Sequence, residues 1–512
     1  MALRRNADQK MDTVGLNRNA AYNVLAGLSS ALVSVALPPL LARLLLADDF
    51  SAWTLALQVA AYLNILSFGL QMVVAQAVAQ SKANNDIDER DSIVSTGFFA
   101  LLVAALCGFI IMAVLAWQSH WLAPTLTPQT RTSLTESLLW LSASFIVQLP
   151  VSILLAVFVG EQRNVWFAVA TICSRAAILV AVGVVAIATV DIVTMGQAWF
   201  SASVIGGFFS WRLWFRLVRQ PNLSWKLCSW DALRKLARGS VALTVWNLSL
   251  LFVTGLQIVL VAHFEFTLVP VFAGALSLTT LLVGIVAAVT GTLVPHIAHA
   301  AANLDAHFPE ADLRYIARLS NLMLYGGTAV LLIGNWWILR YWLGASFADA
   351  GGPVLATIAL AQAIRNSISA YVMTTIALSL QNKLLAGPIA EGMIAFGLGI
   401  VFGSSWGALG VALAMLVAPI ANVSFVMWRD PVGKKFPSFV RVRYIIDTAI
   451  FPAIPLAITA VIYSLLPDGS FSGSTAIVAA LLLAIVYGIC VLLAYRARPV
   501  ASQLVRVNDL GI

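Results

Sequence analysis

Apolar stretches of about 20 residues, each long enough to cross the roughly 30 Å of hydrocarbon in a bilayer, recur from residue 20 to residue 495. Only 10% of the 512 residues are charged and 61% are hydrophobic, a balance typical of membrane proteins. We therefore predict an all-α polytopic membrane protein with about 14 transmembrane helices. The expected spans are about 20–46, 52–79, 93–117, 135–160, 165–188, 193–215, 240–262, 269–300, 314–339, 353–380, 384–403, 406–428, 445–466 and 474–495.

The positions of Lys and Arg predict how these spans are oriented. With a cytoplasmic N-terminus and alternating spans, most Lys and Arg residues fall in cytoplasmic segments, whereas Arg43, Arg131 and Arg340 fall at external ends. We therefore expect both termini to be cytoplasmic. Residues 1–18 are polar and basic and lack the apolar core of a signal peptide, so we expect the first span to be retained. The net charge of +8 then reflects topology, and no nucleic acid is expected as a partner.

Two halves of the chain keep the same hydropathy register. Residues 50–84 align without a gap with 269–303, and the turn at 160–163 meets 380–383 at nearly the same shift. Parallel repeats of this kind enclose a central cavity in alternating-access transporters. We therefore expect two six-helix lobes related as parallel repeats, plus two C-terminal helices. The expected domains are an N-terminal lobe (1–218), a cytoplasmic linker (219–239), a C-terminal lobe (240–428), and helices 13 and 14 with a cytoplasmic tail (429–512).

Four segments carry a resemblance to a known family: 37–80, 291–305, 339–360 and 379–416. They resemble the polysaccharide-transporter branch of the multidrug/oligosaccharidyl-lipid/polysaccharide exporter superfamily. In that branch an Arg-Leu-Leu element often precedes an acidic-aromatic-Gly turn; here Arg43 fits the element, and Ser51 stands where Gly is usual.

The resemblance implies a flippase of the bacterial cytoplasmic (inner) membrane. Such a protein moves a polyprenyl-(pyro)phosphate-linked oligosaccharide from the cytoplasmic to the periplasmic leaflet, for synthesis of O-antigen, capsule or exopolysaccharide. The implied partners are this lipid-linked cargo, the bilayer, a polysaccharide polymerase and a chain-length regulator.

Two arginines lie deep inside apolar spans. Arg175 is about eleven residues into the fifth span and Arg365 about thirteen into the tenth, so a rise of 1.5 Å per residue places both near mid-membrane. An arginine there costs roughly 2.5–3.5 kcal/mol unless it faces water or a partner. A guanidinium stays charged and offers forked donors to phosphate or carboxylate groups. We therefore predict that Arg175 and Arg365 bind a pyrophosphate or an acidic sugar in a hydrated cavity.

Glu391 is the carboxylate that lies well inside a span. The alternative interpretation of the deep arginines is that Arg365 or Arg175 pairs with Glu391 and joins two helices. Glu391 is also a candidate for binding a coupling proton or sodium ion.

Polar side chains recur on helical faces that the cavity would use, although hydrogen bonding between helices is an alternative role for each. The additional substrate-binding candidates are Asn64, Gln71, Asn247, Gln257, Gln362 and Asn366.

The sequence predicts a transporter with no catalytic residues, no cofactor and no metal. It has no GxxxxGK[ST] motif for ATP, and His296 and His299 lack a cysteine or carboxylate at metal-ligand spacing. One alternative is a cation-coupled multidrug exporter of the same superfamily, which usually needs a carboxylate in the first span; residues 20–46 have none. The other is a membrane-embedded glycosyltransferase or polymerase, which would need catalytic groups on larger external loops.

Overall fold

Helices are the regular elements of the part of the chain that the structure describes. The computed structural model describes residues 22, 25–27, 29, 33–67, 69–84, 86–118, 120, 124, 126–218, 222–290, 310–378, 380–435, 440–464, 482 and 485–489. Within these residues, ten helices are long and apolar enough to cross a membrane, which confirms the all-helical membrane class. The predicted span 474–495 lies mostly outside the described residues, as do parts of 20–46 and 269–300.

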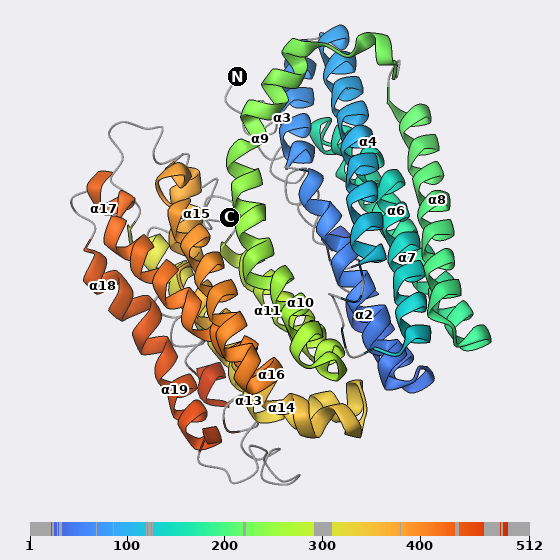
Figure 1. Cartoon of the computed structure of the whole chain (residues 1–512). Coiled ribbons are helices and arrows are strands. Elements are labelled where there is room, and N and C mark those ends of the chain that lie inside the picture. The colour runs from blue at the N-terminus through green and yellow to red at the C-terminus, as the bar shows by residue number, and fades with distance from the viewer. Residues whose placement is uncertain are drawn as a thin grey trace, which may run out of the picture. The chain divides into compact units, whose positions relative to one another are not determined.

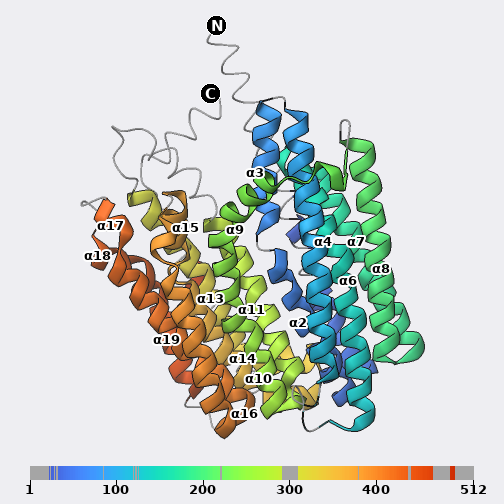
Figure 2. The same ribbon diagram turned by 45° about the horizontal axis from the view of Figure 1, so that its top comes forward.

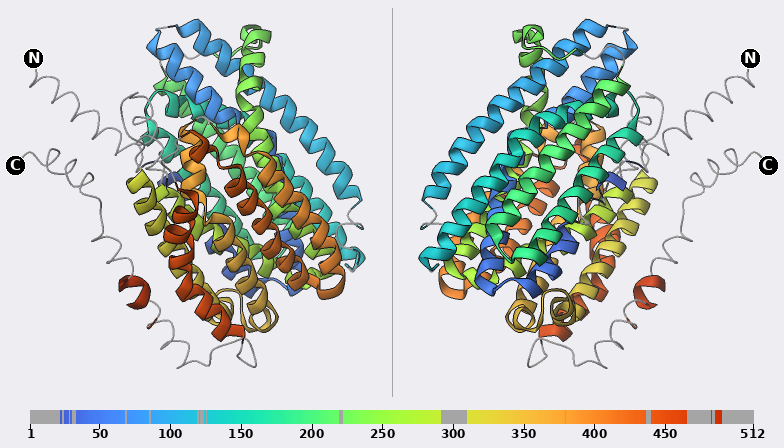
Figure 3. Two further views of the ribbon diagram at one scale, coloured as in Figure 1. Left: turned by 90° about the vertical axis from the view of Figure 1, so that its left-hand side faces the viewer. Right: turned by 90° about the vertical axis from the view of Figure 1, so that its right-hand side faces the viewer.

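The chain divides into two compact units, Met1–Leu248 and Ser249–Ile512. In the N-terminal unit, α6 packs against α4 and α8, and α7 packs against α8 (Figure 1). The right-hand view of Figure 3 shows these long helices side by side. The described elements of this unit are the helical segment Val33–Leu44, α2 (Ala47–Ala61), η1 (Tyr62–Ser67), α3 (Leu70–Ala83), α4 (Ile87–Trp117), α6 (Pro128–Gly160), α7 (Asn164–Thr189), α8 (Ile192–Leu217), η2 (Trp225–Leu227) and most of α9 (Trp230–Leu250).

Polar caps start the long helices of this unit. The side chain of Asp86 accepts a hydrogen bond from the backbone of Glu89, and Asp191 accepts from two backbone amides in the first turn of α8. Such caps satisfy amides that have no partner within the helix. The cap on α4 explains why this helix begins six residues before the predicted span, at Ile87 instead of residue 93.

The second predicted span, 52–79, is not one continuous helix. It consists of α2, the 3-10 turn η1 and α3, and Gly69 immediately before α3 has φ +67°. A residue with a Cβ rarely adopts this left-handed conformation. The hydropathy pattern could not show the break, because apolar residues continue on both sides of it.

In the C-terminal unit, α14 packs against α13, α16 and α11, and α13 also packs against α19. The predicted spans 353–380 and 445–466 begin before their predicted starts, with α14 at Ala345 and α18 at Arg441. The described elements after α9 are η3 (Leu251–Gly255), α10 (Leu256–Phe264), η4 (Phe266–Leu268), α11 (Val269–Thr290), α13 (Glu310–Trp342), α14 (Ala345–Asn366), α15 (Ser369–Ala377), η5 (Gln381–Lys383), α16 (Ala386–Arg429), α17 (Pro431–Lys435), α18 (Arg441–Ile445), η6 (Ile446–Ile450) and α19 (Phe451–Ser464).

The element α16 reverses direction near its middle. Trp406 and Gly407 have non-helical backbone angles, and Gly407 has φ +55°. The backbone amide of Ala408 donates to Glu265 Oε2 over 2.8 Å, which holds the turn. Gly387 near the start of α16 lies against Asn422 near its end, so the two limbs run antiparallel. These limbs correspond to the predicted spans 384–403 and 406–428.

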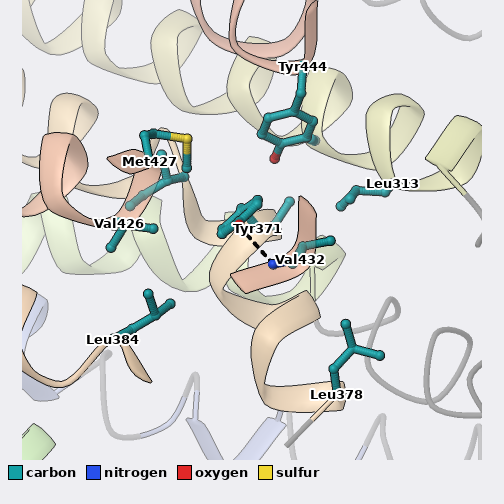
Figure 4. Packing of buried hydrophobic residues seen from close by; sticks show 11 residues of the cluster. Leu313, Tyr371, Leu378, Leu384, Val426, Met427, Val432 and Tyr444 are labelled. Atoms are coloured by element: carbon teal, nitrogen blue, oxygen red, sulfur yellow. Dashed lines mark hydrogen bonds between the residues drawn. The ribbon is translucent and has the colours of Figure 1, made fainter. Parts of the chain in front are cut away.

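Apolar packing holds α13, α15, the second limb of α16 and α18 together. Figure 4 shows Tyr371 at the centre of this cluster, with Tyr444 above it and aliphatic side chains such as Leu313 and Val426 on either side. The buried Tyr371 hydroxyl donates to Asp430 Oδ1 over 2.7 Å and accepts from the backbone amide of Val432 over 3.3 Å. The hydroxyl is therefore satisfied inside an apolar core, as a buried polar group requires.

Candidate functional site

A buried ion pair joins α14 to the first limb of α16. Arg365 Nε lies 3.1 Å from Glu391 Oε1; the Glu391 side chain is fully buried, and that of Arg365 is 13% exposed. Asn422, on the second limb of α16, donates from Nδ2 to Glu391 Oε2 over 2.7 Å. The carboxylate thus has a cation on one oxygen and an amide donor on the other, which offsets part of the cost of burying it.

The helix that carries Arg365 breaks immediately after it. The α14 helix ends at Asn366, and α15 begins at Ser369. Asn366 donates from Nδ2 to the backbone oxygen of Gln362 (2.8 Å) and to its side-chain oxygen (3.2 Å). Buried Asn321 of α13 donates to the oxygen of Ser367 over 2.8 Å, so the carbonyl freed by the break has a partner. Arg365 is therefore held at a stabilised helix end, beside Gln362 and Asn366.

Arg175 lies near the middle of α7 in the N-terminal unit. Its side chain is half-buried and makes no hydrogen bond or ion pair with any residue that the structure describes. The neighbouring polar side chains contact other groups. Thr171 donates to the backbone oxygen of Phe167 over 2.8 Å, and Ser174 lies against Gly206 of α8. A half-buried, unpaired guanidinium retains its full capacity to bind an anion.

The remaining predicted residues lie in different surroundings. Gln257 is fully buried and donates from Nε2 to the oxygen of Phe252 in the π-helical turn η3 over 3.0 Å. Asn64, in the 3-10 turn η1, and Gln71, in the first turn of α3, are both exposed. The side chain of Asn247 lies outside the described residues.

The structure therefore brings together Gln362, Arg365, Asn366 and Glu391 in the C-terminal unit, whereas Asn64, Gln71 and Arg175 belong to the N-terminal unit. The ion pair between Arg365 and Glu391 is the alternative interpretation that the sequence left open. Arg175 is not part of this ion pair. Sequence reasoning missed Asn321 and Asn422. Both are polar residues within apolar helices, and this signal was available, but no spacing rule connects Asn422 to Glu391.

Among the residues that the structure describes, no three His, Cys, Asp or Glu side chains lie close enough together to hold a metal ion. His296 and His299 lie outside the described residues.

The sequence itself identifies the family. Residues 16–301, more than half of the chain, match the family described as "Polysaccharide biosynthesis protein". The chain belongs to this family. No curated protein matches the sequence.

Solved structures with the same fold are membrane transporters. An inward-facing multidrug resistance MATE family transporter of the MOP superfamily superposes with a TM-score of 0.67 at 15% identity, covering 82% of this chain and 95% of its own. The lipid II flippase MurJ, in an inward closed conformation, gives 0.67 at 14% identity, covering 91% of this chain and 98% of its own. A MOP superfamily transporter from Pyrococcus furiosus gives 0.50 at 14% identity, covering 83% and 98%.

Family and fold together give a coarse assignment. The protein is a polytopic membrane protein of the polysaccharide biosynthesis family with the fold of MOP-superfamily transporters.

Proposed function

We propose that this protein is a flippase that moves polyprenyl-(pyro)phosphate-linked oligosaccharide from the cytoplasmic to the periplasmic leaflet by alternating access. The observation that carries the proposal is Arg175, a half-buried cation near the middle of a membrane helix without a partner among the described residues. A cation in that position is costly unless it faces water or an anion. A cargo that carries phosphate groups provides this anion. Because the chain belongs to the polysaccharide biosynthesis family, we propose that the group linked to the phosphate is a glycan.

Arg365 takes part in the proposed cycle through exchange of partners. In the state described here Glu391 neutralises Arg365 at 3.1 Å. The cargo phosphate competes with Glu391 for the guanidinium, because phosphate and carboxylate present similar acceptors to the same donor fork. The displaced carboxylate then binds a proton or a sodium ion, so Glu391 links cargo binding to an ion gradient. Asn64, Gln71, Asn247, Gln257, Gln362 and Asn366 are the proposed polar contacts to the cargo.

A second candidate is a cation-coupled multidrug exporter, and the match to a MATE transporter with a TM-score of 0.67 favours it. Export of a cationic drug needs a carboxylate that the drug itself can reach and that no fixed cation already neutralises. Glu391 is fully buried, and both of its oxygens face donors on Arg365 and Asn422. This arrangement supports an anionic cargo over a cationic one.

Reconstitution tests the proposal. The full-length protein in proteoliposomes receives either a labelled polyprenyl-pyrophosphate-linked oligosaccharide or a fluorescent organic cation. We expect flipping of the lipid-linked sugar, loss of at least tenfold in rate in Arg175→Gln, and no loss in Arg429→Gln, which removes an exposed arginine at the end of α16. Transport of the organic cation with no flipping of the sugar would contradict the proposal and establish the exporter.

A further inference from the structure

The segment from the end of α8 through the first turns of α9 is held against the start of α4. The backbone amide of Ser229 donates to Thr96 Oγ1 over 3.2 Å, and Lys235 Nζ lies 2.8 Å from Glu89 Oε1. Trp225 of η2 also packs edge-on against Phe99 of α4, with ring centroids 5.0 Å apart. Figure 2 shows the first turns of α9 crossing near α3 and α4. Polar and aromatic contacts thus fix one face of this segment.

The first half of α9 is amphipathic. Ala232, Leu236 and Ser240 recur at intervals of four residues and are buried. Arg234 and Arg238, also four residues apart, are exposed. Residues four apart share a face of a helix, so the buried stripe faces the protein and the arginine stripe faces away from it.

Large aromatic side chains lie exposed beside these arginines. Trp225 is 64% exposed and Trp230 is 76% exposed. The side chains of Lys226, Arg234 and Arg238 form no ion pair or hydrogen bond with any described residue. Within 222–240 the acidic residue is Asp231, so the segment has a clear positive excess. We call the set Trp225, Lys226, Trp230, Arg234 and Arg238 the linker surface.

We infer that the linker surface binds the headgroups of anionic phospholipids. Tryptophan is enriched at the membrane–water interface, where an amphipathic ring lies at headgroup level. Basic side chains on an amphipathic helix bind anionic lipid, and each contributes about 1 kcal/mol, or roughly fivefold in affinity. Because the segment is already held against α4, headgroup binding requires little further ordering of the chain. This inference does not depend on the cargo of the proposed flippase.

Thermal unfolding of the purified full-length protein in a neutral detergent tests the inference. Phosphatidylglycerol is titrated in and compared with phosphatidylcholine of the same acyl chains. We expect phosphatidylglycerol to raise the unfolding midpoint at lower concentration than phosphatidylcholine, and 1 M NaCl to abolish the difference, because salt screens exposed charges. The double substitution Arg234→Gln/Arg238→Gln should raise the half-maximal phosphatidylglycerol concentration by about 10- to 30-fold and leave the response to phosphatidylcholine unchanged.

The matched control is Lys383→Gln/Lys434→Gln, which removes two exposed cations elsewhere and should behave as wild type. Equal responses of the wild-type protein to both lipids would overturn the inference and leave a soluble acidic partner as the occupant of the surface. An unchanged phosphatidylglycerol response in the arginine double variant would overturn it as well, as would an equal loss in the lysine control.

Discussion

The buried pair of Arg365 and Glu391 predicts an asymmetric double-mutant cycle. In Arg365→Gln, Glu391 stays fully buried and keeps the amide of Asn422 as its donor, so a charge is left without its cation. Breaking a buried pair in this way typically costs about 3–5 kcal/mol. In Glu391→Gln, the single side-chain oxygen can still accept from Arg365, whose side chain is 13% exposed, and the new NH2 group faces Asn422, whose amide can turn over to present its oxygen. We therefore expect a smaller cost, about 1–2 kcal/mol.

The assay is the thermal unfolding midpoint of each purified variant in one detergent. Since 1 kcal/mol shifts the midpoint of a unit of this size by about 2–4 °C, Arg365→Gln should lower it by roughly 6–20 °C and Glu391→Gln by roughly 2–8 °C. The double variant Arg365→Gln/Glu391→Gln has no buried charge left unpaired, so its midpoint should lie above that of Arg365→Gln. Additive losses in the double variant would refute the reasoning, because they would show that the two groups do not interact.

Three further predictions follow from single residues. Asn321→Leu removes the amide that serves the oxygens of Ser367 and Thr448, at 2.8 and 2.7 Å, and should lower the unfolding midpoint by at least 4 °C; an unchanged midpoint would show that those carbonyls have other partners. Gly407→Ala forces a Cβ into φ +55° and ψ −136° beside Glu265, so yield of folded protein and midpoint should both fall, and a wild-type profile would contradict the turn. Burial raises the pKa of the Cys228 thiol, so maleimide labelling of Cys228, with the other cysteines replaced by serine, should be slower at pH 7.5 than for a free thiol and should still increase above pH 9. Labelling that reaches its plateau below pH 8.5 would contradict the raised pKa.

Hydropathy predicted much of this fold because membrane spans are a local property of sequence. The two limbs of α16 were found as separate spans although a single element covers both, since the turn at Gly407 interrupts the apolar pattern. Helix ends were predicted less well. The start of α4 depends on the cap by Asp86 and lies in polar sequence that hydropathy excludes.

The sequence drew attention to the residues that the structure brings together in the C-terminal unit, but it left their pairing open. Arg365 and Glu391 were recognised because each is charged within an apolar span, and their pairing was one of two open interpretations. Asn422 and Asn321 escaped notice because an amide in a membrane helix is common, and its importance depends on which carbonyl or carboxylate lies opposite. Partners 31 or more residues apart come from the packing of helices, which a single sequence does not encode in any spacing.

The central claim is that Arg175 holds a negatively charged cargo, and a binding measurement tests it most directly. The purified full-length protein is titrated with a polyprenyl-pyrophosphate-linked oligosaccharide and with the same polyprenyl-linked sugar lacking the pyrophosphate. We predict at least tenfold tighter binding of the pyrophosphate form by the wild-type protein, and loss of that preference in Arg175→Gln, since hydrogen bonds to charged groups contribute about 1.5–3 kcal/mol. Equal affinity for the two cargoes, or an undiminished preference in Arg175→Gln, would contradict the account.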